Sequence, residues 1–299
     1  MRSLTLKSES LTRFVNLSAY IGICKFKVVM MLVITAWVGL MLAPSSDRGL
    51  LSQVMSLLGI GLLSASAAAI NHVVDREIDK KMARTRHRPL AQTQLSVNQA
   101  LGFAALLALI GSIALFYWSN TLTLVMTFGA LVGYAVIYTM FLKRATPQNI
   151  VIGGLAGAMP PLLGWISETG QLDVQAWLLV MIIFIWTPPH FWALAIARRN
   201  DYKRADIPML PVTHGSEFTR LFIVIYSILL FLVCLLPYLI TMSGNFYLLS
   251  VLILNSIFLY KSIVLYVKRS DEAAMTLFHF SITYLLLLFI SLFLDRWIL

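Results

Sequence analysis

Nine long, almost uncharged apolar runs dominate this sequence. A helix needs about 20 largely apolar residues to cross the hydrocarbon core of a bilayer, and the runs lack the alternating pattern of membrane β-barrel strands. They therefore predict an all-α polytopic membrane protein, a bundle of nine transmembrane helices. The runs lie at residues 28–43, 50–74, 95–118, 121–142, 149–167, 174–197, 218–240, 245–267 and 274–294.

The composition excludes a soluble globular domain. Of 299 residues, 59% are hydrophobic and only 12% are charged, whereas about 25% of an ordinary soluble domain is charged. Little of the chain is left for an aqueous domain, so the polar loops must carry any chemistry. The two cysteines, Cys24 and Cys234, are too few and too far apart for a disulfide framework or a zinc site.

The basic residues are distributed unevenly across the predicted membrane. If the N-terminus and the loops after the second, fourth, sixth and eighth helices share one side, that side holds 19 of the 23 lysines and arginines, and the other holds Arg48 and Arg296. Because loops rich in Lys and Arg stay cytoplasmic, we expect a cytoplasmic N-terminus and a C-terminus outside. Residues 1–27 are then a cytoplasmic N-terminal tail, and residues 28–299 form a single nine-helix domain. The net charge of +10 calls for no nucleic acid.

Oxygen ligands lie at the end of the second apolar run. Asn71, Asp75 and Asp79 are spaced four residues apart, so they share one face if the helix continues through them. Two carboxylates and an amide suit Mg²⁺, a hard cation that is usually held by carboxylates and substrate phosphates. Arg84 and Arg88 follow at the same spacing and are candidate partners of phosphate oxygens. The alternative is that the carboxylates are solvated and paired with neighbouring bases.

A second polar loop, residues 198–215, is predicted on the same side of the membrane. It again mixes acids with bases, among them Asp201, Lys203 and Asp206. Two such loops at the mouth of one bundle form a site for a polyanion held through a metal ion, and the helices below offer an apolar chamber. The pattern predicts an amphiphilic substrate with a diphosphate head and a hydrocarbon tail.

The motifs in these loops resemble those of the intramembrane aromatic prenyltransferase superfamily. Within it, the chain is most similar to the protohaem IX farnesyltransferases, or haem O synthases. The matching segments lie between about residues 70 and 215 and are Asp79–Leu90, Leu142–Trp165, Trp186–Leu194 and Asp201–Pro211. The second acid of the superfamily's Asp-x-x-x-Asp motif would fall at position 205, where this sequence has Ala205. Haem O synthases share that alanine, and whether Asp206 serves as a metal ligand instead stays open.

The resemblance implies a reaction and a set of site residues. The reaction is transfer of the farnesyl group of farnesyl diphosphate to a vinyl group of haem b, with addition of water, to give haem O and diphosphate. The implied location is the bacterial inner membrane, with haem A synthase or a terminal oxidase as partners. The implied residues are Asp75, Asp79 and Asp201 as catalytic Mg²⁺ ligands with Asn71 in support, Arg84, Arg88, Lys143 and Lys203 on the diphosphate, and His190 on the haem.

Several alternatives stay open at this point. The acceptor of the prenyl group is a quinone precursor or a lipid in other members of the superfamily, and a membrane transporter is the main alternative outside the enzymes. His190 follows Pro188 and Pro189. It is a haem contact, as an axial ligand of the iron or a base near the vinyl group, or else a histidine bonded to a carbonyl that a proline kink has freed. Gly153 and Gly157 indicate close helix packing, or room for a flat porphyrin or a prenyl chain.

Overall fold

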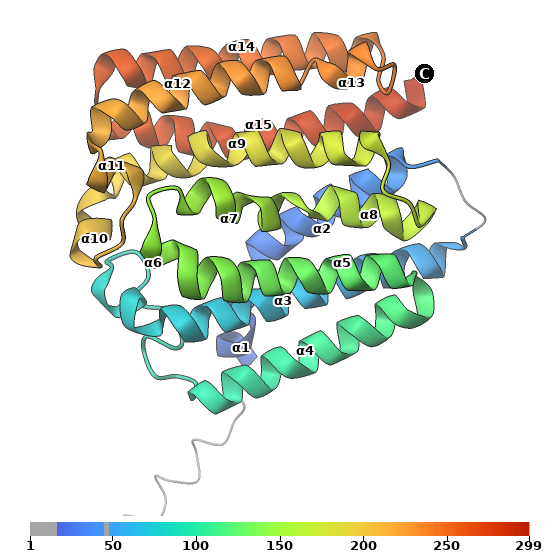
Figure 1. Cartoon of the computed structure of the whole chain (residues 1–299), viewed down its shortest axis with the longest axis horizontal. Coiled ribbons are helices and arrows are strands. Elements are labelled where there is room, and N and C mark those ends of the chain that lie inside the picture. Colours follow the sequence, from blue (N-terminus) through green and yellow to red (C-terminus); the bar gives the residue numbers. More distant parts are fainter. Residues whose placement is uncertain (1–16, 45–47, 299) are drawn as a thin grey trace, which may run out of the picture.

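The computed structural model describes residues 17–44 and 48–298, which form a bundle of long helices stacked in layers (Figure 1). No strand occurs among these residues. The helices are α1 (Leu17–Ile23), α2 (Phe26–Leu42), α3 (Leu50–Lys81), α4 (Val97–Trp118), α5 (Thr121–Val132), the π-helix η2 (Gly133–Leu142), α6 (Lys143–Ala145), α7 (Asn149–Ala158), α8 (Pro160–Thr169), α9 (Val174–Ala197), α10 (Arg199–Arg204), α11 (Leu210–Thr213), α12 (Gly215–Val233), α13 (Leu236–Leu239), α14 (Asn245–Lys268) and α15 (Asp271–Ile298).

The helix lengths confirm the predicted class, an all-α multi-pass membrane protein. In the described part of the chain, eight helical segments are long and apolar enough to span a membrane, and a ninth is reached only if α1 and α2 count as one broken span. These two helices are bent by 53° at Lys25, whose φ of 51° is left-handed. Helix therefore begins at Leu17, inside the segment 1–27 that was predicted as a tail.

Two further predicted helices are broken at prolines. The run 149–167 divides into α7 and α8 because Pro160 and Pro161 begin α8, and a proline has no N–H to continue the ladder of the preceding helix. The run 218–240 divides into α12 and α13 before Pro237 for the same reason. The apolar runs continue through these prolines, so run length alone does not show the breaks.

Helices α2 and α8 approach each other with their backbones in contact. A Cβ atom placed on Gly39 would overlap the carbonyl oxygen of Pro161, and one placed on Gly164 would overlap that of Ala36. Small residues permit this close approach in membranes, where packing rather than hydrophobic burial holds helices together. The contact anchors the N-terminal helices to the middle of the bundle.

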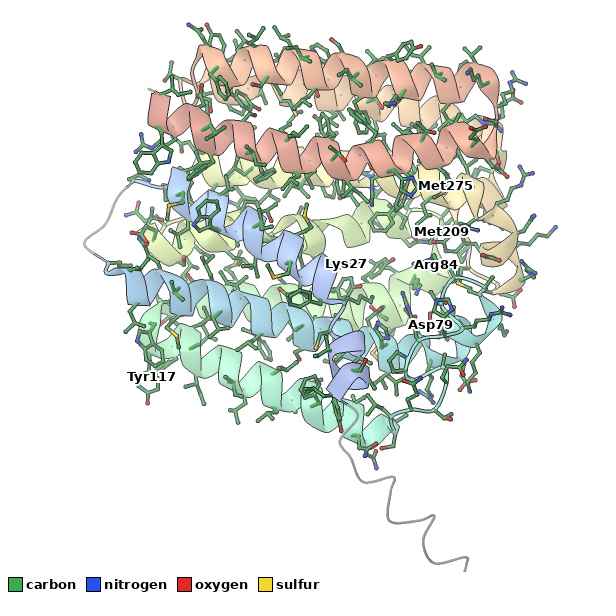
Figure 2. The ribbon with its side chains drawn as sticks, turned by 180° about the vertical axis from the view of Figure 1, so that it is seen from behind. Lys27, Asp79, Arg84, Tyr117, Met209 and Met275 are labelled. Atoms are coloured by element: carbon green, nitrogen blue, oxygen red, sulfur yellow. The ribbon has the colours of Figure 1, made fainter. Side chains whose placement is uncertain are left out.

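Both polar loops lie at the same end of the bundle, as predicted. The C-terminal end of α3 lies beside α6, α10 and α11, on the left in Figure 1, and Lys81 and Asp206 form an ion pair of 3.9 Å between the two loops. Asp79, Arg84 and Met209 lie at this end in Figure 2, and Tyr117 lies at the other. The bundle therefore has one polar mouth.

Candidate active site

The site is built on one face of α3. This helix continues unbroken to Lys81, so Asn71, Asp75 and Asp79 stay in register, and their exposed fractions are only 2%, 2% and 3%. The Asn71 amide donates to Oδ2 of Asp75 at 3.0 Å. Such deep burial of ionisable groups at a membrane helix end is costly unless they are paired, which makes these residues poor candidates for simple solvated carboxylates.

The π-helix η2 supplies the opposite wall. In a regular α-helix, Thr139 and Lys143 would lie about 140° and 180° around the helix axis from Tyr134. The three side chains would then point to different sides of the helix. The wider turns of a π-helix, with bonds from residue i to i+5, bring residues i, i+5 and i+9 to one side. Accordingly Thr139 accepts a hydrogen bond from Asn71 at 3.1 Å, and Lys143 reaches Asp75. The predicted span over residues 121–142 is present, but its second half is a π-helix, and this change of pitch turns Thr139 and Lys143 toward α3.

Each predicted acid is paired with a basic residue. The ammonium of Lys143 donates to Oδ2 of Asp75 at 2.6 Å, and one guanidinium nitrogen of Arg88 contacts both oxygens of Asp79 at 3.0 Å. The third pair joins Arg204 to Asp201 at 2.7 Å. The structure thus brings together two predicted diphosphate ligands, Lys143 and Arg88, with two predicted metal ligands.

Lys25 is a site residue that the sequence analysis counted only as a tail charge. It sits in the break between α1 and α2, and its ammonium donates to Oδ1 of Asn71 at 2.5 Å and to the Tyr134 hydroxyl at 3.3 Å. Tyr134 stacks on Tyr138 with ring centroids 5.6 Å apart. One sequence signal was available: a lysine surrounded by apolar residues just before a membrane span is expensive to place there without a partner.

The second loop contributes a buried pair of residues. Asp201 and Tyr202 are 5% and 6% exposed, and burial raises the pKa of the Tyr202 hydroxyl, although the neighbouring Arg84 guanidinium opposes that shift. Lys203 is exposed and forms no hydrogen bond or ion pair with the described residues. The Asp206 side chain is 87% exposed, so it does not take the enclosed place of the acid missing at 205.

The donor set fits a hard divalent cation in part. Oδ1 of Asp75 is buried and has no hydrogen-bond partner, which is the state of a carboxylate oxygen that awaits a cation. Within residues 17–44 and 48–298, no three acidic, His or Cys side chains converge on one point. The acids therefore form two half-sites: Asp75 and Asp79 on α3 are paired with Lys143 and Arg88, and Asp201 on α10 is paired with Arg204.

His190 lies in a separate, apolar part of the bundle. It is 7% exposed, and its Nδ1 lies 2.6 Å from the Ser281 hydroxyl on α15. The ring is stacked between Trp186 and Phe278. The alternative of a histidine bonded to a freed backbone carbonyl is wrong, because its hydrogen-bond partner is a side chain.

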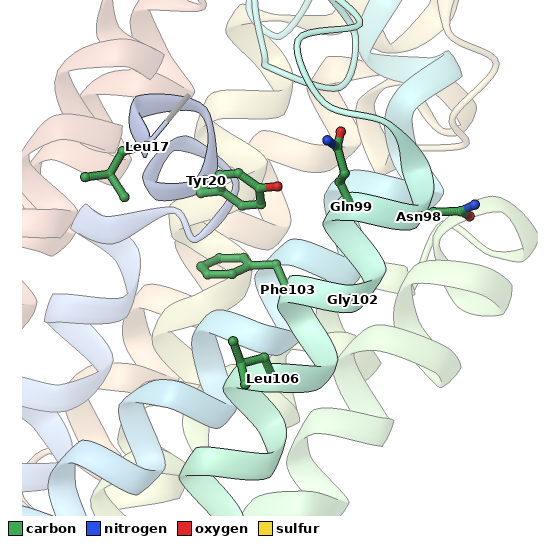
Figure 3. A pocket seen from close by; sticks show the side chains of 7 residues that line it. All are labelled: Leu17, Tyr20, Asn98, Gln99, Gly102, Phe103 and Leu106. Carbon is green, nitrogen blue, oxygen red and sulfur yellow. The ribbon is translucent and has the colours of Figure 1, made fainter. Parts of the chain in front are cut away.

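A shallow hollow on the outside of the bundle is distinct from this site. It has a volume of about 350 Å³ and lies between α1 and α4 (Figure 3). Tyr20 and Phe103 form an edge-to-face pair there, with ring centroids 4.9 Å apart, and Asn98 and Gln99 are among the other lining residues. No buried carboxylate faces this hollow, so it does not compete with the α3 face as the candidate active site.

This chain is similar to known proteins in both sequence and fold. The "Protoheme IX farnesyltransferase 2" of Pseudoalteromonas translucida is 64% identical to this chain, and the match covers 97% of this chain and 94% of that protein. The "Protoheme IX farnesyltransferase" of Psychromonas ingrahamii is 58% identical, and the match covers 99% of this chain and 96% of that protein. The structure of a UbiA homolog from Archaeoglobus fulgidus bound to GPP and Mg²⁺ superposes with a TM-score of 0.64 at 14% identity, covering 92% of this chain and 99% of that one.

The relatives and the family model together identify the chain as a membrane-embedded transferase of prenyl groups. The model of the UbiA prenyltransferase family matches residues 32–293. The chain belongs to that family.

Proposed function

We propose that this protein transfers the farnesyl group of farnesyl diphosphate to a vinyl group of haem b, with addition of water, to give haem O and diphosphate. The observation that carries the proposal is the buried α3 face, where Asp75 and Asp79 are each held by a base. This arrangement is combined with 53–64% identity to several proteins named protoheme IX farnesyltransferase.

The diphosphate head belongs at the polar mouth. Lys25, Lys143 and Arg88 are already gathered within hydrogen-bond distance of the α3 face, and charge-assisted bonds to phosphate oxygens are among the strongest that side chains make. Arg84 lies at the same mouth beside Tyr202. Lys203, although predicted as a diphosphate contact, would have to turn inward from the surface.

Mg²⁺ would be held at the two half-sites, by Asp75 and Asp79 on α3 with the Asn71 amide in support, and by Asp201 on α10. The bound metal would neutralise charge on the departing diphosphate. In this arrangement Oδ1 of Asp75, which has no hydrogen-bond partner, would bind the metal. Lys143 would then exchange its ion pair with Asp75 for one with the phosphate oxygens.

The chain itself guides the reacting groups. The bond from farnesyl C1 to the diphosphate oxygen breaks, and the terminal vinyl carbon of the haem forms a bond to C1. Water then adds to the adjacent carbon and loses a proton. The stacked faces of Tyr134 and Tyr138 lie next to the carboxylate cluster and would stabilise an allylic cation without trapping it.

The direct test is turnover by the purified protein in lipid. Labelled farnesyl diphosphate with haem b should give an extractable haem whose mass has increased by one farnesyl group and one water. Labelled farnesyl transferred instead to 4-hydroxybenzoate or to lipid, with haem b unchanged, would contradict the proposed acceptor.

Removal of the metal should stop the reaction. With EDTA in excess, release of diphosphate is expected to fall to background and to return when Mg²⁺ is restored. Ca²⁺ should restore it poorly, because this larger ion favours six to eight oxygen ligands. Diphosphate release that continues at full rate in EDTA would refute the assignment of Asp75, Asp79 and Asp201 as metal ligands.

Loss of the Lys143 charge should weaken binding of the prenyl diphosphate. Lys143→Met is expected to raise the KM for farnesyl diphosphate at least about tenfold, because it removes one charge-assisted bond and leaves Asp75 unpaired. Arg144→Met is the matched control, since Arg144 is the exposed neighbour and should change KM less than twofold. Equal effects of the two substitutions, measured from initial rates, would contradict a specific role for Lys143.

The topology is also proposed. The mouth of the site faces the cytoplasm of a bacterial cell and the C-terminus lies outside, because the polar mouth collects the basic loops. Haem A synthase and a terminal oxidase are the proposed users of the product.

A further inference from the structure

The His190 ring is held in a slot whose walls are both aromatic. The Trp186 ring lies 4.3 Å from it at an interplanar angle of 17°, and the Phe278 ring lies 4.7 Å away at 26°. Trp186 and His190 are one turn apart on α9, whereas Phe278 comes from α15. Pro188 and Pro189 stiffen the intervening turn because their φ angles are fixed. The ring therefore has one orientation.

The hydrogen bonds around Ser281 fix which nitrogen of this histidine carries its proton. The Ser281 hydroxyl has a single hydrogen, and it donates to the Phe278 carbonyl at 2.6 Å. The same oxygen lies 2.6 Å from Nδ1 of His190, so it must accept there, and Nδ1 carries the hydrogen. In the neutral ring, Nε2 then holds a free lone pair.

Nε2 is not used by the protein's own hydrogen bonds, although His190 is only 7% exposed. It forms no hydrogen bond with any described residue, and it is not among the fully enclosed polar atoms that lack partners. His72 provides the contrast, because both of its ring nitrogens are enclosed and unpartnered. His190 thus combines an oriented ring, a fixed tautomer and an unpartnered lone pair that is not fully enclosed, which are the features of a histidine that binds a metal.

The slot is connected to the diphosphate end through α7. A Cβ atom on Gly153 would meet the Tyr138 ring, and one on the adjacent Gly154 would meet the Thr187 side chain at 2.9 Å. Tyr138 belongs to the wall of the carboxylate site, and Thr187 is three residues from His190. Two neighbouring glycines of one helix therefore touch both regions.

We propose that Nε2 of His190 is an axial ligand of the iron of a porphyrin acceptor and that Ser281 is the residue that positions it. The inference rests on the proposed function, since haem b supplies the iron. A single neutral histidine would hold the flat acceptor at one point while its vinyl group faces the prenyl donor. A quinone precursor contains no metal ion, so Nε2 of His190 could not coordinate it.

The test uses the full-length protein in lipid with ferrous haem b and no prenyl donor. Wild type should show the resonance Raman stretch of an iron–histidine bond. His190→Gly should lose that band, and added imidazole should restore an iron–imidazole band and tighten haem binding. The matched control is His279→Ala, because His279 is an exposed histidine on the same helix as Ser281 and its loss should leave the band unchanged.

Ser281→Ala isolates the positioning role. Trp186 donates to the backbone carbonyl of Ser281 at 3.0 Å, so this substitution removes the bond to His190 and leaves the bond to Trp186. It should lower the iron–histidine stretching frequency and weaken haem binding about 10–100-fold, the usual cost of losing the group that orients a metal-bound histidine. An unchanged frequency would overturn the role of Ser281.

The two proposals fail in different ways. If wild type makes haem O but shows no iron–histidine band, or if His190→Gly keeps the band, the ligand assignment is wrong and the proposed reaction stands. If wild type shows the band but transfers no farnesyl group to haem, the proposed reaction is wrong and His190 is a ligand in a protein with another activity.

Discussion

Asp75→Asn should reduce haem O formation by about 10²–10³-fold or more, the cost of losing one preorganised electrostatic contact in an active site. The side chain is 2% exposed, its Oδ2 binds Lys143 at 2.6 Å, and its Oδ1 is without a partner. The amide keeps the size of the carboxylate but removes the charge that would hold Mg²⁺. The measurement is kcat/KM with both substrates.

Glu77→Gln provides the matched control for that substitution. Glu77 lies two residues away on α3, its side chain is 63% exposed, and it pairs with Lys80 at the surface. Exposed ion pairs contribute little, so turnover should stay within twofold of wild type. Wild-type turnover by the Asp75 variant would rule out the α3 face as the active site. A loss accompanied by a lowered thermal midpoint would instead indicate unfolding, so the midpoint is measured in parallel.

Gly164→Ala should destabilise the bundle by about 1–3 kcal/mol, the usual cost of overpacking. The new methyl group would overlap the Ala36 carbonyl, and backbone cannot move aside as a flexible side chain can. Helices α2 and α8 must then separate, although alanine is otherwise the better helix former. The midpoint of unfolding by SDS in mixed micelles measures the effect.

Gly157→Ala is the control for that prediction. Gly157 is also helical, but no atom lies within 4 Å of a Cβ placed there. This substitution should be neutral or slightly stabilising. Equal loss of stability in the two variants would show that the α2–α8 contact is not specifically tight.

Much of the fold and part of the site could be predicted from sequence. Span length and the uneven distribution of bases follow from local composition, and the spacing of Asn71, Asp75 and Asp79 defines one helix face whatever surrounds it. The two polar loops are separated by an even number of predicted spans, which is enough to place them at one end of the bundle.

The composition of the site could be predicted only in part. Lys25 was assigned to a tail because the break that brings it to Asn71 depends on a left-handed residue, not on an apolar pattern. The contact between Lys143 and Asp75 requires the π-helix, and the helical period used for prediction places Lys143 on the far side. Asp201 was expected to join the α3 carboxylates, but it is held in a separate pair by Arg204.

The sequence by itself determined that this is a multi-pass helical membrane protein with a polyanion site at one end, because apolar run length and charge position are properties of the chain alone. Only the tertiary structure decided which base meets which acid and which nitrogen of His190 is free. Those contacts join residues from different helices, and their geometry depends on helix breaks, a change of helix pitch and the close approach of backbones at glycine.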